Sequence, residues 1–122
     1  MHFLFIFLDG VGLGANDPAV NPFAGADTPN LVKLLGGQKL VQDTLKNGGN
    51  PFRTISTTLF GLDARLGVDG TPQSASGQAT ILTGRNIPKE LGHHYGPKPN
   101  LEIRPYLKNG TLFHSLLERG YH

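Results

Sequence analysis

The chain has 122 residues, a formal net charge of +2 and no cysteine. Its 11 Lys and Arg residues are spread without a run, so a nucleic-acid partner is not indicated, and neither a disulfide framework nor a thiolate metal site can form. The length fits about one small domain, no apolar stretch is long enough to predict a membrane partner, and the lack of cysteine fits a cytoplasmic protein.

An apolar run opens the chain, from Phe3 to Leu8. It does not alternate with polar residues, which is typical of a strand covered on both faces in a parallel sheet. It spans only six residues, carries no basic leader and ends at Asp9, so a signal peptide is not indicated. The prediction is an α/β fold with a mainly parallel sheet flanked by helices.

Asp9 and the glycine-rich loop after it follow this expected strand, where open α/β sheets place their ligands. An ionised carboxylate there needs a partner, so Asp9 is a candidate ligand of a divalent metal; the alternative is a turn residue that accepts backbone N–H bonds. Gly10–Ala15 also fits the spacing of a dinucleotide-binding loop, so a non-catalytic module that binds NAD or FAD is the alternative function. Against it, Asn16–Pro18 stands where that motif needs a helix.

The middle of the chain predicts one helix and two strands. The stretch 16–22 holds two prolines and excludes a regular helix. A helix is expected from N-cap Thr28 and Pro29 to Gly36, with a buried stripe of Leu31, Leu34 and Leu35. Gln38–Asp43 is interpreted as a short strand, and Arg53–Leu62, rich in Thr and large apolar residues, as a second strand of the sheet.

Two serines, Ser74 and Ser76, begin a segment with helical spacing (Ala75, Ala79, Leu82) that Gly84 ends. A helix N-terminus carries unpaired N–H groups and the positive end of the dipole, which suits phosphate and lowers the cost of an alkoxide. Ser74 is therefore a candidate nucleophile, and a helix cap is the alternative. No G-x-S-x-G elbow or Walker lysine occurs, which leaves a metal-activated hydroxyl as the chemistry.

The C-terminal part is interpreted as a loop over Arg85–Asn109, broken by prolines, and a last helix from Thr111 to Gly120. The loop contains His93 and His94, which point to opposite sides on an extended backbone, so at most one readily joins a site. A strand is expected after the last helix, so the sequence is expected to stop within a fold.

Taken together, these motifs form a recognisable order. They are the apolar strand with Asp9-Gly-x-Gly, Thr28-Pro-Asn-Leu31, Ser74-x-x-Gly77 and Thr83-Gly-Arg85. The order resembles the alkaline phosphatase superfamily, in particular the branch of cofactor-independent phosphoglycerate mutase, phosphopentomutase and related metalloenzymes. The resemblance covers nearly the whole chain but only the N-terminal part of that fold.

The resemblance implies two divalent ions, Mn²⁺, Zn²⁺ or Mg²⁺, with Asp9 as a metal ligand. Ser74 matches the residue that contacts the metals, attacks phosphorus and is carried as a phospho-enzyme. Gln78 stands where the mutases commonly carry a histidine, which favours a phosphatase-like relative. Candidate substrate-binding residues are Gln78, Arg85, His93 and His94.

The further metal ligands of that family lie in a later region rich in Asp and His. We therefore expect residues 1–122 to be the N-terminal portion of a catalytic α/β domain whose partners are a phosphate-ester small molecule and the remaining C-terminal part of its own chain. Alone, the fragment is expected to turn over little. A third hypothesis is an interaction protein in which both motifs are structural.

Overall fold

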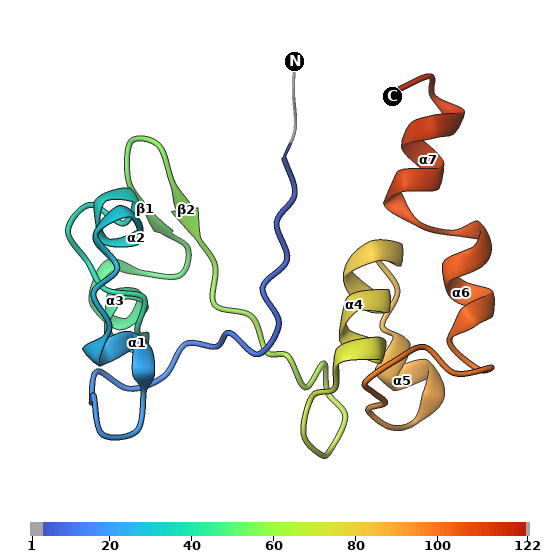
Figure 1. The fold of residues 1–122 in the computed structure, drawn as a ribbon, viewed down its shortest axis with the longest axis horizontal. Helices are drawn as coiled ribbons and strands as arrows, with labels where there is room; N and C mark the ends of the chain where they lie inside the picture. Colours follow the sequence, from blue (N-terminus) through green and yellow to red (C-terminus); the bar gives the residue numbers. More distant parts are fainter. Residues whose placement is uncertain (1–3, 122) are drawn as a thin grey trace. The chain divides into compact units, whose positions relative to one another are not determined.

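The computed structural model describes residues 4–121 and divides the chain into two compact units, Met1–Leu62 and Asp63–His122 (Figure 1). The protein is a small α/β protein with short helices and one two-stranded antiparallel sheet, which lies in the first unit. No helix between residues 4 and 121 is both long enough and apolar enough to cross a membrane.

The first unit contains three short helices, α1 (Pro22–Gly25), α2 (Pro29–Leu34) and α3 (Gln42–Gly48). As predicted, no regular helix covers residues 16–21, but Pro22, the last residue of the stretch 16–22, begins α1. Helix α2 begins with Pro29 after N-cap Thr28, as predicted. The Thr28 side chain makes no capping hydrogen bond, however. Of the predicted leucine stripe only Leu35 is buried. Ala24 and Val41 are buried as well, so the core of this unit is small.

The predicted strand at 38–43 is wrong, because this stretch leads into α3. The N–H of Gln42, its first residue, donates to the carbonyl of Gly14 at 2.8 Å. The Thr44 hydroxyl donates back to the carbonyl of Lys39 at 2.6 Å. These bonds turn the chain at Val41. Val41 is buried, and this burial explains the apolar pattern of residues 38–43 without a strand.

The stretch predicted as one strand over 53–62 forms a hairpin instead. Strands β1 (Phe52–Arg53) and β2 (Thr58–Leu59) pair antiparallel, with Phe52 opposite Leu59. Thr54 makes the turn: its hydroxyl accepts the N–H groups of Ser56 and Thr57, at 3.3 and 3.0 Å. The threonine that favours a strand by propensity thus reverses the chain through its side chain.

The N-terminal apolar segment runs as an extended chain (Figure 1) but belongs to no sheet; Phe3, the first residue of the predicted strand, lies outside the described residues. Exposed fractions alternate along it, as expected when side chains point to opposite sides: Leu4 80%, Phe5 42%, Ile6 68%, Phe7 40% and Leu8 65%. The only sheet among residues 4–121 is the β1–β2 hairpin, so a parallel sheet stays a prediction.

The second unit is helical, with α4 (Ser74–Thr83), α5 (Ile87–Leu91), α6 (Arg104–Asn109) and α7 (Leu112–Glu118). Its core joins α4 and α5 to the residue before α6 through four buried apolar side chains: Ala75, Ala79, Ile87 and Ile103. Partly buried side chains pack around them: Leu91, Tyr95, Tyr106 and Leu107. The predicted helical spacing of Ala75 and Ala79 is confirmed, and Gly84 ends α4 with a left-handed φ of 68°.

The prediction of one long loop over 85–109 is wrong, because α5 and α6 lie within it. Their prolines, Pro88 and Pro105, occupy the first turn of each helix, where the missing N–H costs nothing. Asn86 caps α5 by accepting the N–H of Lys89 at 3.1 Å. Proline here starts helices rather than interrupting a loop.

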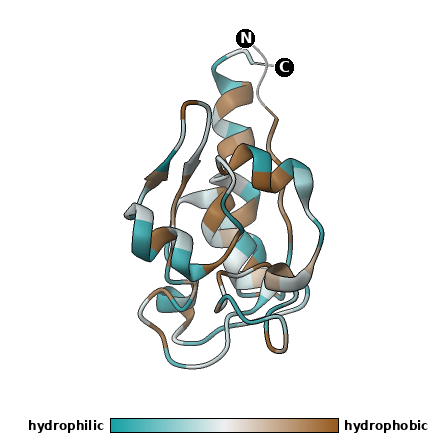
Figure 2. Cartoon of the chain, turned by 90° about the vertical axis from the view of Figure 1, so that its left-hand side faces the viewer, coloured by the Kyte–Doolittle hydropathy of each residue, from teal (hydrophilic) through white to brown (hydrophobic). Residues whose placement is uncertain are grey.

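Helix α7 begins and ends as the sequence predicts. The Thr111 hydroxyl accepts the N–H of His114 at 3.2 Å, and Gly120 has a φ of 79°. Its apolar residues give it the brown bands of Figure 2, yet three of them are exposed by about half: Leu112 46%, Phe113 51% and Leu117 59%. The predicted helix is present, but most of its apolar face is not part of a core.

Candidate functional site

The candidate site begins at the N-terminus of α4. Gln73 is the N-cap residue and makes no side-chain capping bond, so Ser74 is the first helical residue rather than the cap. Ser74 is partly buried. A side chain at this position stands beside the N–H groups of the first helical turn, where negative charge is stabilised.

The second serine, Ser76, is fully buried, with 0% exposure. Its hydroxyl donates to the carbonyl of Gln73 at 3.3 Å and accepts the N–H of Tyr95 at 3.0 Å. Its own N–H donates to the carbonyl of Tyr95 at 2.9 Å. Ser76 is therefore a structural residue, which leaves Ser74 as the candidate nucleophile of the pair.

The backbone N–H groups in the first turn of α4 donate to different acceptors. The N–H of Gly77 makes the ordinary helical bond to the carbonyl of Gln73 at 3.0 Å, and that of Ser76 donates to Tyr95. A Cβ added to Gly77 would meet nothing within 4 Å, so the helix surface three residues after Ser74 is open to an approaching group.

Gln78, one helical turn after Ser74, is partly buried on the same side of α4. It belongs to the second unit, as do the candidate substrate-binding residues Arg85, His93 and His94. The structure thus gathers five of the six predicted site residues, Ser74 included, in one unit. The sixth, Asp9, belongs to the first unit.

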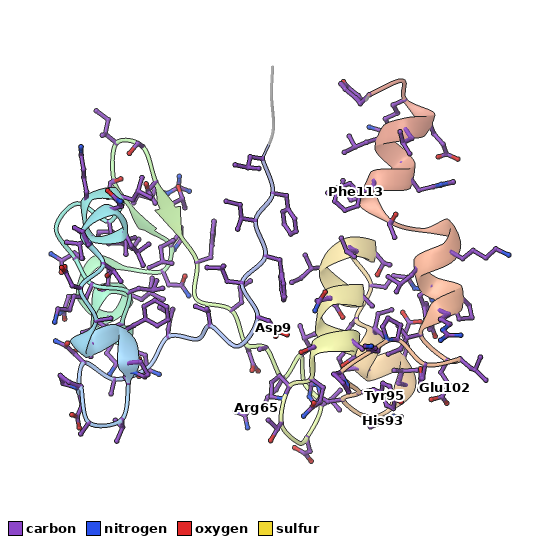
Figure 3. The ribbon with its side chains drawn as sticks, in the orientation of Figure 1. Asp9, Arg65, His93, Tyr95, Glu102 and Phe113 are labelled. Atoms are coloured by element: carbon purple, nitrogen blue, oxygen red, sulfur yellow. The ribbon has the colours of Figure 1, made fainter. Side chains whose placement is uncertain are left out.

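The two histidines lie in the segment that follows α5. His93 is exposed; its Nδ1 is 3.1 Å from the Leu91 carbonyl, and its ring meets that of Tyr95 edge to face at 6.3 Å (Figure 3). His94 is partly buried, and its Nε2 is 3.2 Å from the carbonyl of Val68. His94 therefore ties this segment to the turn that precedes α4.

Arg85 makes a two-pronged ion pair with Glu90. Its Nε is 3.0 Å from Oε1 and its terminal nitrogen 2.6 Å from Oε2, while the guanidinium lies 4.7 Å from the centre of the Tyr106 ring. The hydrogen bond from Arg85, with a smaller one from Tyr106, lowers the pKa of Glu90, and the same pair raises the pKa of Arg85. The charge of Arg85 is thus already compensated within the fold, and its role with a substrate stays a prediction.

Replacing Arg85 by Gln should raise the pKa of Glu90 toward its ordinary value of 4.5. A carboxyl group whose pKa is lowered by folding stabilises the protein above the unfolded pKa, and that contribution is lost as the pH falls through the folded value. The wild-type protein should therefore lose more stability than R85Q on acidification below about pH 4.5. NMR titration of the Glu90 carboxyl checks the shift, and equal pKa values in both proteins would contradict it.

Asp9 is exposed, and Gly10 after it has a left-handed φ of 71°. The loop Gly10–Ala15 is not followed by a helix until α1 at Pro22, so the strand–loop–helix unit that a dinucleotide fingerprint requires is not formed here. This geometry disfavours the nucleotide-binding alternative.

Metal binding has two candidate donors in this chain, Asp9 and Ser74. The part of the chain that the structure describes contains no group of three or more His, Asp or Glu side chains arranged to hold an ion. These two residues are fewer donors than Mn²⁺, Zn²⁺ or Mg²⁺ takes from its surroundings.

Sequence reasoning missed the contacts of Tyr95 and Glu90. Tyr95 bonds to a residue 19 positions earlier, and Glu90 lies in a helix that was predicted as loop. No local pattern marks the first contact. The second has a signal in the sequence, since Asn86 and Pro88 are typical of a helix start and place Glu90 within its first turn.

A comparison of the chain with models of protein families gave no match, and neither did comparisons with curated proteins and with solved structures.

Proposed function

We propose that this chain is part of a metal-dependent phosphoryl-transfer enzyme, phosphatase-like or phosphomutase-like, in which Ser74 is the nucleophile. The observation that carries the proposal is the division of roles at the start of α4. Ser76 has no exposed surface, whereas Ser74 is only partly buried, is the first helical residue and lies beside the open surface at Gly77. The order of sequence motifs that resembles the alkaline phosphatase superfamily supports the same assignment.

In the proposed reaction, the Ser74 oxygen attacks the phosphorus of a phosphate ester in line with the leaving oxygen. The new bond joins this oxygen to phosphorus and the ester P–O bond breaks, while solvent water accepts the serine proton and another water molecule protonates the leaving alkoxide. The first turn of α4 stabilises the negative charge. Water, or the hydroxyl of an acceptor, then removes the phosphoryl group and restores Ser74.

Two divalent ions, Mn²⁺, Zn²⁺ or Mg²⁺, would neutralise charge on the phosphoryl oxygens when bound. We propose Asp9 as one ligand, and the remaining C-terminal part of the same protein as the source of the others. Gln78, His93 and His94 are the proposed contacts to the substrate. The exposed apolar surfaces at Leu4–Leu8 and on α7 fit a chain that packs against further structure, as this proposal requires.

Replacing Ser74 by Ala in the full-length protein should reduce hydrolysis of 4-nitrophenyl phosphate in the presence of Mn²⁺ to the level without enzyme, because no covalent intermediate can form. Ser115→Ala, which changes an exposed serine of α7, is the matched control and should keep wild-type activity. Undiminished hydrolysis by S74A would overturn the proposal.

A further inference from the structure

The segment after α5 is held against the start of α4 by one reciprocal contact. The N–H and the carbonyl of Tyr95 both bond to Ser76, to its hydroxyl at 3.0 Å and to its N–H at 2.9 Å. Ser76 has no exposed surface, so water does not compete for these bonds. The pair therefore fixes the backbone at Tyr95 relative to the first turn of α4.

Next to this pair, the chain passes very close to the backbone of Ser74. A Cβ built on Gly96 would lie 3.2 Å from the backbone nitrogen of Ser74 and 3.1 Å from Oε1 of Gln73. These separations are shorter than ordinary van der Waals contact, so only a residue without a side chain fits without displacement. The bonds between Ser76 and Tyr95 hold the segment close to the backbone of Ser74, and the absence of a side chain at Gly96 leaves room for it there.

We infer that Ser76 is a positioning residue of the proposed phosphoryl-transfer site: by holding Tyr95, it sets the distance of the segment His93–Gly96 from Ser74. The inference rests on the proposed function. Ser76 touches neither substrate nor the reacting atoms; it acts through the backbone of Tyr95 and Gly96. His94, whose Nε2 is 3.2 Å from the carbonyl of Val68, also holds this segment to the turn before α4.

The test compares two hydroxyl deletions on α4. Ser76→Ala removes the bond to the N–H of Tyr95. Thr80→Val is the matched control, because the Thr80 hydroxyl donates to the carbonyl of Ser76 at 2.9 Å and accepts the N–H of Ile87 at 3.2 Å, and neither bond holds Tyr95. In the full-length protein with Mn²⁺ and 4-nitrophenyl phosphate, S76A should lower the rate of Ser74 phosphorylation at saturating substrate by about 10–100-fold, as expected for a misplacement of about 1 Å. T80V should leave this rate within about twofold of wild type, because both bonds between Ser76 and Tyr95 remain in place.

A second variant, Gly96→Ala, adds a methyl group at the close contact with Gln73 and Ser74 and leaves Ser76 unchanged. It should also lower the rate of Ser74 phosphorylation. Melting temperatures and amide exchange at Tyr95 show whether each variant is folded at the assay temperature. Equal rates for wild type, S76A and G96A, with Ser74 phosphorylated in all three, would overturn the inference and leave the proposed function standing. The same loss in T80V as in S76A would also overturn it, because the effect would then follow stability. A wild-type protein that never carries phosphate on Ser74 would overturn the proposed function and this inference together.

Discussion

Replacing Ile87 by Ala is expected to destabilise the Asp63–His122 unit by about 2–5 kcal/mol, because the lost side chain leaves a cavity in a packed core. Ile87 is 0% exposed and contributes to the core formed by Ala75, Ala79 and Ile103. A unit of this size has a free energy of unfolding of only about 3–9 kcal/mol. The melting temperature should therefore fall by at least about 8 °C, as measured by circular dichroism.

The matched control changes the same residue type on a neighbouring helix. Ile81 lies on α4 and is 50% exposed, so Ile81→Ala creates no cavity and should alter the free energy of unfolding by about 0.5 kcal/mol or less. Equal losses of stability in the two variants would contradict the core as described.

Gly77→Ala is expected to have opposite effects on stability and on reactivity. Glycine inside a helix costs roughly 0.5–1 kcal/mol relative to alanine, and an added Cβ at Gly77 meets nothing within 4 Å, so the variant should be more stable by about that amount. The same methyl group occupies the open surface beside Ser74. If a phosphate ester approaches there, Ser74 phosphorylation should fall by at least about tenfold, because a displacement of about 1 Å costs that much or more.

Thermal denaturation and the rate of phosphorylation, measured on the same preparation, check both halves of this prediction. A stabilised protein with unchanged phosphorylation would show that the substrate does not use this side of α4. Unchanged or reduced stability would contradict the placement of Gly77 in open space.

The elements that the sequence predicts best are those whose signals are local. Helix α4 carries its apolar spacing and its Gly84 end within ten residues, and α7 carries its cap in Thr111. Helices α5 and α6 were missed because Pro88 and Pro105 were interpreted as breaks, although proline in the first helical turn is favourable. The hairpin was missed because the turn-forming bonds of Thr54 compete with its strand propensity.

In the candidate site, too, only the features with a local signal could be predicted from the sequence. The position of Ser74 at a helix start follows from the local pattern, and the structure places it one residue inside the expected cap. The burial of Ser76 could not be predicted, because it depends on Tyr95, which is 19 residues away. The strand expected at 3–8 requires neighbouring strands, and among residues 4–121 the only strands are the two-residue pair β1 and β2.

The central claim is that Ser74 carries the phosphoryl group. Its most direct test is peptide mapping by mass spectrometry of the full-length protein after incubation with 4-nitrophenyl phosphate and Mn²⁺ and rapid acid quenching. We expect phosphoserine at Ser74, formed in the presence of the metal and absent after its removal with a chelator. Phosphate on another residue, or none on a protein that hydrolyses the ester, would contradict it.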